Sequence, residues 1–319
     1  MSSLGGYYIV RSEDFVYNPR ISTSAPVGPI NRNKLGRIGV MSPLYTVFRP
    51  HDIDTTYLEY FFKSKYWHSF MNFNGDSGAR SDRFSIKDSV FFEMPIPIPH
   101  IDEQKKIGAF LDKLDSLITL HQRKYDKLTK VKKAMLEKMF PENGSPYPEI
   151  RFKGFTDAWE QRKLGDTVQI TMGQSPDGST YSDVPSDYIL VQGNADLQNG
   201  WVSPRVWTSQ MTKKADAGDL IMSVRAPAGA MGKTAYNAVI GRGVAAIKGN
   251  EFIYQLLEKM DSDGYWKALS CGSTFESLNS DNIKNADVLI PDVAEQEKIG
   301  EYFLAIDRLI TLHQRKPFC

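Results

Sequence analysis

Cysteine is scarce in this chain, which has only Cys271 and Cys319 among its 319 residues. Two cysteines make no disulfide framework, so a reducing cytoplasm is the expected environment. No apolar run approaches the roughly 18–20 residues of a membrane span, and the opening MSSLGGYYIV lacks the basic start and apolar core of a signal peptide. The formal net charge of +1 gives no overall sign of nucleic-acid binding, so any basic surface has to be local.

Catalytic motifs are absent as well. The GAMGKT segment at 229–234 resembles a phosphate-binding loop, but that loop needs glycine at position 227, where this chain has proline. The segment 291–298 faintly resembles a nuclease core, but its polar groups are too close in sequence to lie on separate strands. The five histidines show no metal-ligand spacing among themselves or with cysteine. With no adenine-methylation tetrad either, the sequence predicts no catalytic residue, no metal site and no cofactor bound to this chain.

An internal repeat is the main feature that the sequence does have. Residues 104–124 and 296–316 are identical at 13 of 21 positions with an offset of 192, and both end in LITLHQRK. A period this long indicates a duplicated domain followed by a helix, not a solenoid. Fainter matches lie upstream in the same order in both halves: Asp14 with Asp219, Arg20 with Arg225, and residues 65–67 with residues 264–266.

The two halves are unequal. In the second half 60 residues separate Trp159 from Asp219, whereas 13 residues precede Asp14 in the first half, so about 47 residues have no counterpart. After the shared LITLHQRK the first copy continues as YDKLTKVKKAMLEKMF, whereas the second meets Pro317. We therefore expect a truncated first domain and a truncated second repeat helix.

Apolar periodicity predicts the helices. Single helices are expected near residues 55–70 and 252–260, and longer ones over 103–140 and 292–316. In the two long helices apolar residues recur at alternating steps of four and three, which is the seam of a coiled coil. We expect these helices to pair antiparallel, with Leu111, Leu114 and Ile118 facing Ile306 and Ile310. The seam residues are Ile107, Leu111, Leu114, Ile118, His121, Ile299, Phe303, Ile306, Ile310 and His313, with the two histidines as polar residues that fix the register.

Positive charge gathers in segments that are rich in turn residues. Arginine, asparagine and glutamine read purine edges in the major groove, whereas lysine and other arginines neutralise phosphates. The alternative for each residue singly is an ordinary solvated side chain. The candidate DNA-binding residues are Arg20, Arg32, Lys34, Arg37, Arg80, Arg83, Gln174, Ser175, Arg205, Lys213, Lys214, Arg225, Lys233, Arg242, Ser273 and Thr274.

Two similar domains, each followed by a long helix, resemble the specificity (S) subunit of type I restriction-modification systems. The matching stretches are MPIPIPHIDEQKKIGAFLDKLDSLITLHQRK and its copy VLIPDVAEQEKIGEYFLAIDRLITLHQRK, with WEQRKLGD at 159–166 and GDLIMSVR at 218–225. The resemblance covers nearly the whole chain. It implies an α+β fold in which two target-recognition domains are joined by long helices that form an antiparallel coiled coil.

The expected divisions of the chain follow from the repeat and from this resemblance. They are 1–99, a partial first recognition domain; 100–141, the first long helix; 142–158, a linker; 159–291, the second recognition domain; 292–316, the truncated second helix; and 317–319, a tail.

The resemblance also implies a function. In this family each recognition domain reads one half of a split DNA target, and the paired helices set the gap between the halves and dock two methyltransferase subunits. This chain is then a non-catalytic DNA-binding subunit whose partners are double-stranded DNA, methyltransferase (M) subunits and a restriction (R) subunit. S-adenosylmethionine, Mg and ATP are expected on the partner subunits.

Two other functions remain as alternatives. One is a coiled-coil adaptor that binds protein instead of DNA, and salt-dependent binding to duplex DNA separates it from a DNA reader. The other is an enzyme with its own methylation or cleavage activity, which would need a cofactor or metal motif. The shortened second helix leaves part of the apolar seam unpaired, so we also expect self-association or cover by a methyltransferase subunit.

Overall fold

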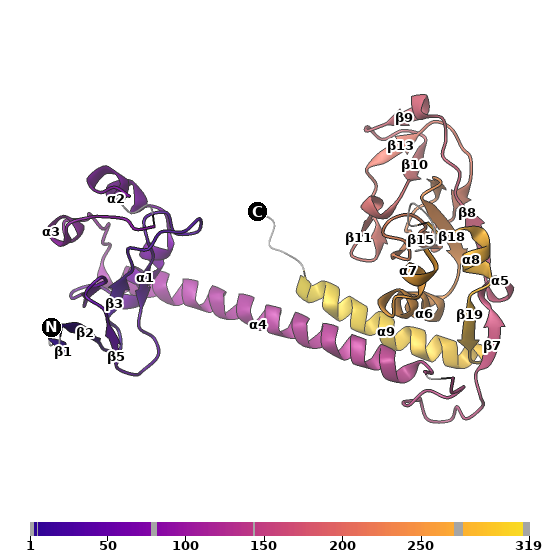
Figure 1. Ribbon diagram of the computed structural model, residues 1–319, viewed down its shortest axis with the longest axis horizontal. Coiled ribbons are helices and arrows are strands. Elements are labelled where there is room, and N and C mark those ends of the chain that lie inside the picture. The colour runs from indigo at the N-terminus through magenta and orange to yellow at the C-terminus, as the bar shows by residue number, and fades with distance from the viewer. Residues whose placement is uncertain (1–2, 5, 78–81, 143, 271–276, 315–319) are drawn as a thin grey trace. The chain divides into compact units, whose positions relative to one another are not determined.

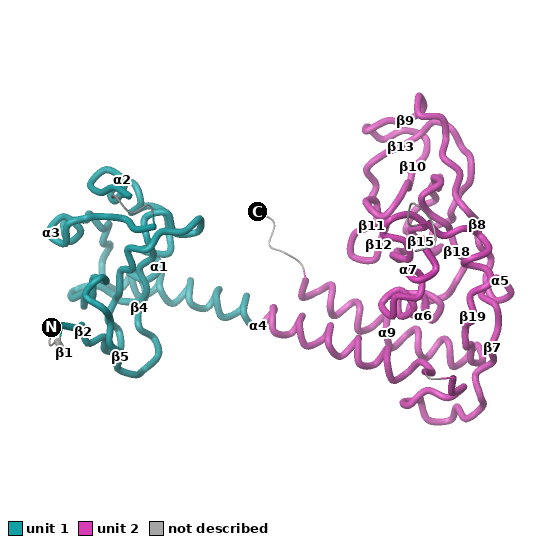
Figure 2. The backbone as a smooth tube through the Cα atoms, in the orientation of Figure 1, with its two compact units in different colours: residues 1–120 teal, residues 121–319 magenta. Residues whose placement is uncertain are grey.

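The computed structural model describes residues 3–4, 6–77, 82–142, 144–270 and 277–314. It divides into two compact units, residues 1–120 and residues 121–319, and helix α4 (Ile101–Met139) runs through the division (Figure 1, Figure 2). Within the described ranges no helix combines the length and the apolar character needed to cross a membrane.

Unit 1 contains two small antiparallel sheets, with strand orders β1-β2-β5 and β4-β3-β6. Side chains from β3, β4, α1 and α2 form its core, in which Phe15 and Met71 are fully buried. The bounds are β1 Ser3–Leu4, β2 Tyr7–Val10, β3 Phe15–Tyr17, β4 Ile30–Arg32, β5 Gly39–Met41, β6 Thr46–Phe48, α1 Thr55–Lys63, α2 His68–Asn74 and α3 Asp88–Phe91.

The segment near 55–70 forms two helices, so the prediction of a single helix there is wrong. The side chain of Asp54 caps α1 by accepting a hydrogen bond from the backbone N–H of Tyr57. After α1, Ser64 takes an extended conformation, and its backbone N–H donates to the carbonyls of Tyr60 and Phe61 in the last turn of the helix. The apolar spacing was informative only for α1, whose buried residues are Leu58, Phe61 and Phe62.

Unit 2 is larger and contains more strands. Its bounds are β7 Glu160–Lys163, α5 Leu164–Thr167, β8 Gln169–Met172, η1 Gly178–Thr180, β9 Tyr181–Ser182, β10 Tyr188–Val191, η2 Asn194–Asp196, β11 Leu197–Gln198, β12 Trp201–Val202, β13 Val206–Thr208, β14 Lys214–Ala215, β15 Leu220–Ser223, β16 Met231–Lys233, β17 Ala238–Ile240, β18 Val244–Lys248, α6 Glu251–Ser262, α7 Tyr265–Ser270, α8 Ser280–Lys284, β19 Asp287–Ile290 and α9 Val293–Gln314. The chain is therefore a mixed helix-and-strand protein, as predicted.

Two sheets of unit 2 share a core. One has the order β11-β12-β16-β15-β18-β8 and the other β14-β17-β10-β13-β9. Because neighbouring strand residues point to opposite faces, Leu220 and Met222 pack in the cluster that holds helices α6 and α9. Ile221, between them, packs instead with Val191 and Ile240 of the second sheet. The six-stranded sheet is thus covered on both faces.

Hydrogen bonds and strand pairing show that the two units share one arrangement of strands. The carboxylate of Asp14 accepts from the backbone N–H of Arg11 at 2.7 Å, and that of Asp219 accepts from Asp216 at 2.9 Å, three residues upstream in each case. The strand that follows has the same neighbours in both units. Phe15 lies opposite Arg32 and Phe48, and Leu220 lies opposite Lys233 and Ile247.

The repeat helices are attached to their units in the same way. Gln104 donates its side-chain amide to the Pro99 carbonyl at 2.8 Å, and Gln296 donates to the Pro291 carbonyl at 2.9 Å. One turn later, α4 and α9 each carry a glycine where a Cβ atom would lie 3.0–3.2 Å from the first turn of the neighbouring helix, α1 or α6. A side chain there would push the helices apart.

Helix α9 pairs with the C-terminal part of α4, which corrects the expected register. Phe303 and Ile306 are buried in the cluster that contains Met139 and Phe140. His121 meets His313, with their Nδ1 atoms 2.8 Å apart. Residue numbers fall along α9 as they rise along α4, so the pair is antiparallel. The seam residues expected opposite Ile306 and Ile310 are not there: Leu114 is 39% exposed and Ile118 62% exposed, and Leu111 is half-buried.

A buried ion cluster holds this helix pair to α6. The Lys132 ammonium lies 2.9 Å from Glu258 and 2.8 Å from Asp307, and its side chain is only 15% exposed. Burial alone lowers the pKa of Lys132, but the two carboxylates outweigh it and raise the pKa. The lysine therefore stays charged where α4, α6 and α9 meet.

Candidate nucleic-acid interface

A polar surface lies where several strands of unit 2 end, and we call it the strand-end surface. Its residues are Gln174, Ser175, Gln192, Lys213, Arg225 and Arg242. They come from segments that follow β8, β10, β15 and β17 and that precede β14. Five of the six were predicted as DNA contacts from the sequence, and the fold brings them together with Gln192.

Backbone hydrogen bonds hold these segments side by side. The N–H of Gln174 donates to the Ile240 carbonyl at 2.8 Å, and that of Arg242 donates to the Ser175 hydroxyl at 3.2 Å. Ile240 in turn donates to the Lys213 carbonyl at 2.8 Å, while Val224 donates to the Gly243 carbonyl at 2.9 Å. The side chains are thus carried on a fixed backbone framework.

Glycines allow the segments to approach so closely. A Cβ atom on Gly243 would lie 2.0 Å from the Gln192 carbonyl oxygen, and one on Gly173 would lie 2.1 Å from the Gly241 oxygen. Both contacts are with backbone, which cannot move aside as a flexible side chain can. These glycines were not predicted as part of the site, although Gly241 and Gly243 flank a predicted site residue, Arg242, which was the available signal.

Three cations of this surface point to water without a carboxylate partner. Lys213, Arg225 and Arg242 are exposed, and within the described ranges none forms a salt bridge. Gln174 and Gln192 lie among them. Unpaired guanidinium and ammonium groups beside amide side chains are the chemistry that contacts phosphates and purine edges of duplex DNA.

Two predicted DNA contacts are instead buried inside their units. The Arg32 side chain is 6% exposed, and it lies 2.7 Å from Glu59. The Lys233 side chain is 12% exposed, and it lies 2.6 Å from Glu251, with its ammonium over the Tyr254 ring at 4.1 Å. They occupy equivalent strand positions, so both units use this cation to fix the sheet to the next helix. Neither can reach DNA without breaking that contact, and we remove both from the interface.

Three further candidates are paired at the surface. Arg205 bonds Asp196 at 2.8 Å, although half of its own side chain is exposed. Lys214 lies 3.0 Å from Asp216, and the neighbouring Lys248 and Lys214 together lower the pKa of that aspartate to about 2. Lys34 lies 3.4 Å from both Glu59 and Asp112. Their charges are partly neutralised within the chain.

Two candidates of unit 1 lie in a backbone contact that has a counterpart in unit 2. Arg20 and Arg83 face each other in an isolated β-bridge, as Arg225 and Ser277 do in unit 2. Arg37 is exposed on the loop before β5. Among the candidates, Arg80, Ser273 and Thr274 lie outside the described residues. Within the part of the chain that the structure describes, no group of three or more metal-ligating side chains is placed to hold a metal ion.

Known proteins resemble this chain in sequence. Residues 8–130 and 156–317 match the family model of the type I restriction modification DNA specificity domain. A Methanocaldococcus jannaschii protein named "Putative type I restriction enzyme MjaX specificity subunit" is 28% identical over 243 residues, which are 73% of this chain and 57% of that protein. The MjaVIII specificity subunit from the same organism is 23% identical over 308 residues, which are 88% of this chain and 71% of that protein. The chain thus spans little more than half the length of the MjaX relative.

Solved structures share the fold. The HsdS subunit from Thermoanaerobacter tengcongensis aligns with a TM-score of 0.53 and 23% identity, over 96% of this chain and 76% of that one. The S subunit of a type I restriction-modification system from M. genitalium aligns with a TM-score of 0.62 and 12% identity, over 96% and 79%. Since the family model matches most of both units, the chain belongs to the family of type I restriction-modification DNA specificity proteins.

Proposed function

We propose that this chain is the DNA-reading subunit of a type I restriction-modification complex. In this proposal it binds duplex DNA and directs methyltransferase and restriction subunits to a target made of two separated halves. The observation that carries the proposal is the strand-end surface, where three unpaired cations and two glutamines are fixed on one backbone framework. Family membership supports the same reading.

Each side chain has a specific task in this proposal. Arg225 and Arg242 present guanidinium groups that can donate two hydrogen bonds to guanine, and Gln174 and Gln192 can bond adenine in the same groove. Lys213 contacts a phosphate. A base contact would select one position of the target, whereas a phosphate contact would strengthen binding to all sequences alike.

The chain contributes recognition and no chemical step. Adenine methylation, ATP-driven movement and cleavage would belong to the partner subunits, which would carry S-adenosylmethionine, Mg and ATP. Helices α4 and α9 would dock the methyltransferase subunits and set the distance between the half-targets. The curated relatives are named as specificity subunits, which supports this division of labour.

Adjacent lysines provide a matched test of DNA binding by the full chain. Lys213 has no salt bridge among the described residues, whereas Lys214 is paired with Asp216. We expect K213A to weaken duplex binding and to lower its dependence on salt concentration, and K214A to change both much less. Fluorescence anisotropy with labelled duplex DNA over a salt series measures both quantities. Equal effects of the two variants would contradict the proposed surface.

A second experiment tests sequence reading. The chain is co-expressed with a cognate methyltransferase subunit, and methylated adenines are mapped across the genome. We expect one split motif, and we expect R225A or R242A to relax one position of it. A methylation pattern that is identical for wild type and both variants would remove these arginines from base reading. No methylation with a subunit that binds the chain would contradict the proposed function.

A further inference from the structure

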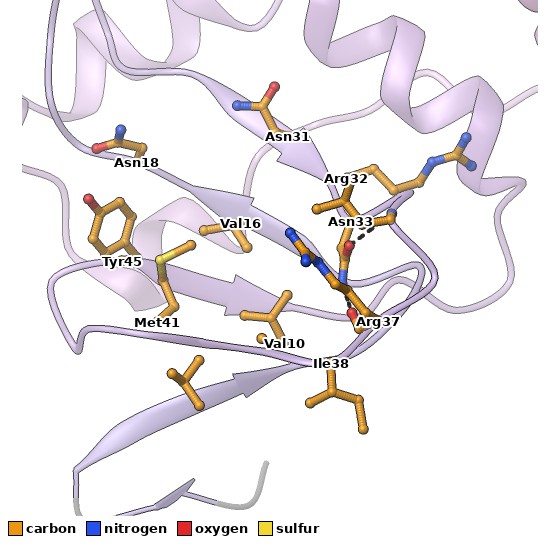
Figure 3. Close-up of a pocket in the computed structure, with 13 residues that line it drawn as sticks. Val10, Val16, Asn18, Asn31, Arg32, Asn33, Arg37, Ile38, Met41 and Tyr45 are labelled. Carbon is orange, nitrogen blue, oxygen red and sulfur yellow. Dashed lines mark hydrogen bonds between the residues drawn. The ribbon is translucent and has the colours of Figure 1, made fainter.

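A pocket of about 660 Å³ opens between the two sheets of unit 1. Its apolar lining includes Val10 from β2, Val16 from β3, Met41 from β5 and Tyr45 (Figure 3). On its rim, the Asn33 amide donates to the Arg37 carbonyl at 3.0 Å. No residue of the strand-end surface lines this pocket, although Arg37, a candidate DNA contact of unit 1, does.

The same place in unit 2 is filled core. Strand registers identify the counterparts, because Val10 pairs with Gly39 as Ala215 pairs with Ala238. In the adjoining sheet, Val16 pairs with Val47 as Ile221 pairs with Ala246. The counterparts of Val10, Val16, Gly39 and Met41 are therefore Ala215, Ile221, Ala238 and Ile240, and all four are at most 3% exposed.

The filling of unit 2 comes from β10, β11 and β12. Strand β10 runs parallel to β17, with Ile189 beside Ala238 and Val191 beside Ile240. Val191 is 0% exposed and Val202 is 6% exposed, and both belong to the buried cluster. These strands lie in the stretch that has no sequence counterpart in the first half.

In unit 1 the corresponding edge is open. Strand β5 is the counterpart of β17 and ends the order β1-β2-β5, so among the described strands nothing pairs with its outer side. Ile38 and Val40 are 69% and 61% exposed. The pocket has apolar side chains on the sheets and the amides of Asn18, Asn31 and Asn33 beside them. An exposed strand edge next to such a pocket offers unpaired main-chain groups and a place for alternate side chains of an added strand.

We propose that the edge of β5 and this pocket form a docking site for an apolar β-strand that the described residues of this chain do not supply. The incoming strand is apolar, like Tyr188–Val191 of β10, and it adds parallel to β5 as β10 adds to β17. Its alternate side chains fill the pocket in the places of Ile189 and Val191. The site does not depend on the strand-end surface of unit 2.

A second copy of this chain fits the site less well. Its own β10 is already paired on both sides, with β13 and β17, so it is not free to be donated. The β5 edges of two copies could instead pair with each other. Such a pair would join exposed edges but would bring no β10-type side chains into the pocket.

A labelled synthetic peptide of residues 186–203 tests the site on the full chain. We expect saturable binding by fluorescence anisotropy and slower amide hydrogen exchange at residues 38–41. Exchange at residues 238–240 should not change, because that edge is occupied. Val191→Asp in the peptide should weaken binding at least about tenfold, since an apolar side chain would no longer enter the pocket.

Variants of the chain locate the peptide. Met41→Lys should weaken binding by a similar factor, whereas Leu44→Lys, which is 57% exposed and outside the pocket lining, should leave it unchanged. If Met41→Lys disturbs unit 1, as judged by hydrogen exchange without peptide, the peptide variant decides alone. The proposal is overturned by an absence of saturable binding, or by protection at residues 238–240 instead of 38–41. Dimers that Met41→Lys dissociates, without peptide binding, would assign the edge to a second copy.

Discussion

Equivalent aspartates of the two repeat helices make similar contacts in the two units, but they are buried to different extents. Asp115 in unit 1 accepts hydrogen bonds from Tyr60 and Lys63, which hold the pKa of this carboxyl below its usual value, and its side chain is 54% exposed. The equivalent Asp307 in unit 2 bonds Gln255 and Lys132, and its side chain is 25% exposed. The repeated sequence thus specifies the contact, and the surroundings decide how much it stabilises the fold.

The largest expected difference between the units concerns the apolar seam. Phe303→Ala should destabilise unit 2 by about 3–5 kcal/mol, because Phe303 is fully buried and leaves a cavity. Leu111→Ala, at the same repeat position in α4, should cost far less, because Leu111 is half-buried. Hydrogen exchange resolved along α4 and α9 measures each effect locally. Similar losses would show that the N-terminal half of α4 is covered in solution.

The next difference concerns the lysines that pair with the equivalent aspartates. Lys132→Met leaves Glu258 and Asp307 without the cation between them, although Tyr254 and Gln255 still donate hydrogen bonds to them, and we expect a loss of about 3 kcal/mol. Lys63→Met removes two ion pairs of a half-exposed lysine, with Asp115 and with Glu59. Glu59 keeps Arg32 as a partner, so the loss should stay below about 1 kcal/mol. Urea unfolding monitored by hydrogen exchange separates the units. Adding Asp307→Asn to the Lys132→Met variant should recover part of the lost stability, and no recovery would contradict the ion cluster.

A smaller difference should appear in DNA binding. Arg225→Ala should weaken binding to the target duplex by about 1–3 kcal/mol if Arg225 contacts a base edge. Arg20→Ala, the equivalent change in unit 1, should have the smaller effect, because the described part of unit 1 has no counterpart of β10, the strand that precedes Gln192 in the strand-end surface. Anisotropy titrations at one fixed salt concentration compare the two. A larger loss for Arg20→Ala would reverse the comparison.

The smallest effect concerns pH at the end of the helix pair. Burial, His121 and Lys124 lower the pKa of His313 from 6.5. A histidine with a lowered pKa takes up fewer protons in the folded state, so its contribution is full above pH about 6.5 and is lost as the pH falls below that value. We expect faster hydrogen exchange at residues 308–314 on acidification. His313→Asn should remove this dependence, and an unchanged acid response in that variant would assign it elsewhere.

The sequence predicted the helices better than it predicted which residues of neighbouring helices face each other. The 39-residue helix α4 was expected almost at its observed bounds, since its apolar spacing and its terminal acids and prolines are local signals. Its register with α9 was not predictable, because the same spacing continues along the whole helix and fits several alignments. The break at Ser64 depends on local backbone conformation that periodicity does not encode.

The candidate site shows the same limit. Residue types marked every member of the strand-end surface except Gln192, but they also marked Arg32 and Lys233, whose side chains the fold buries. Their partners lie far along the chain, with Glu251 18 residues beyond Lys233, and only tertiary packing brings them together. Whether a cation is paired or free is therefore decided by the fold and not by its neighbours in sequence.

The meeting of His121 with His313 has a consequence for inheritance. These rings come from the same position of LITLHQRK, so the antiparallel helices are related there by a local twofold axis between two like residues. A genetic exchange that swaps one coding copy of this stretch for the other leaves the contact unchanged. A substitution in one copy alone removes this symmetry, because the two residues at the contact then differ. Copying the substitution to the other repeat restores it. The contact between α4 and α9 can thus survive recombination that replaces the sequences on either side of the repeat.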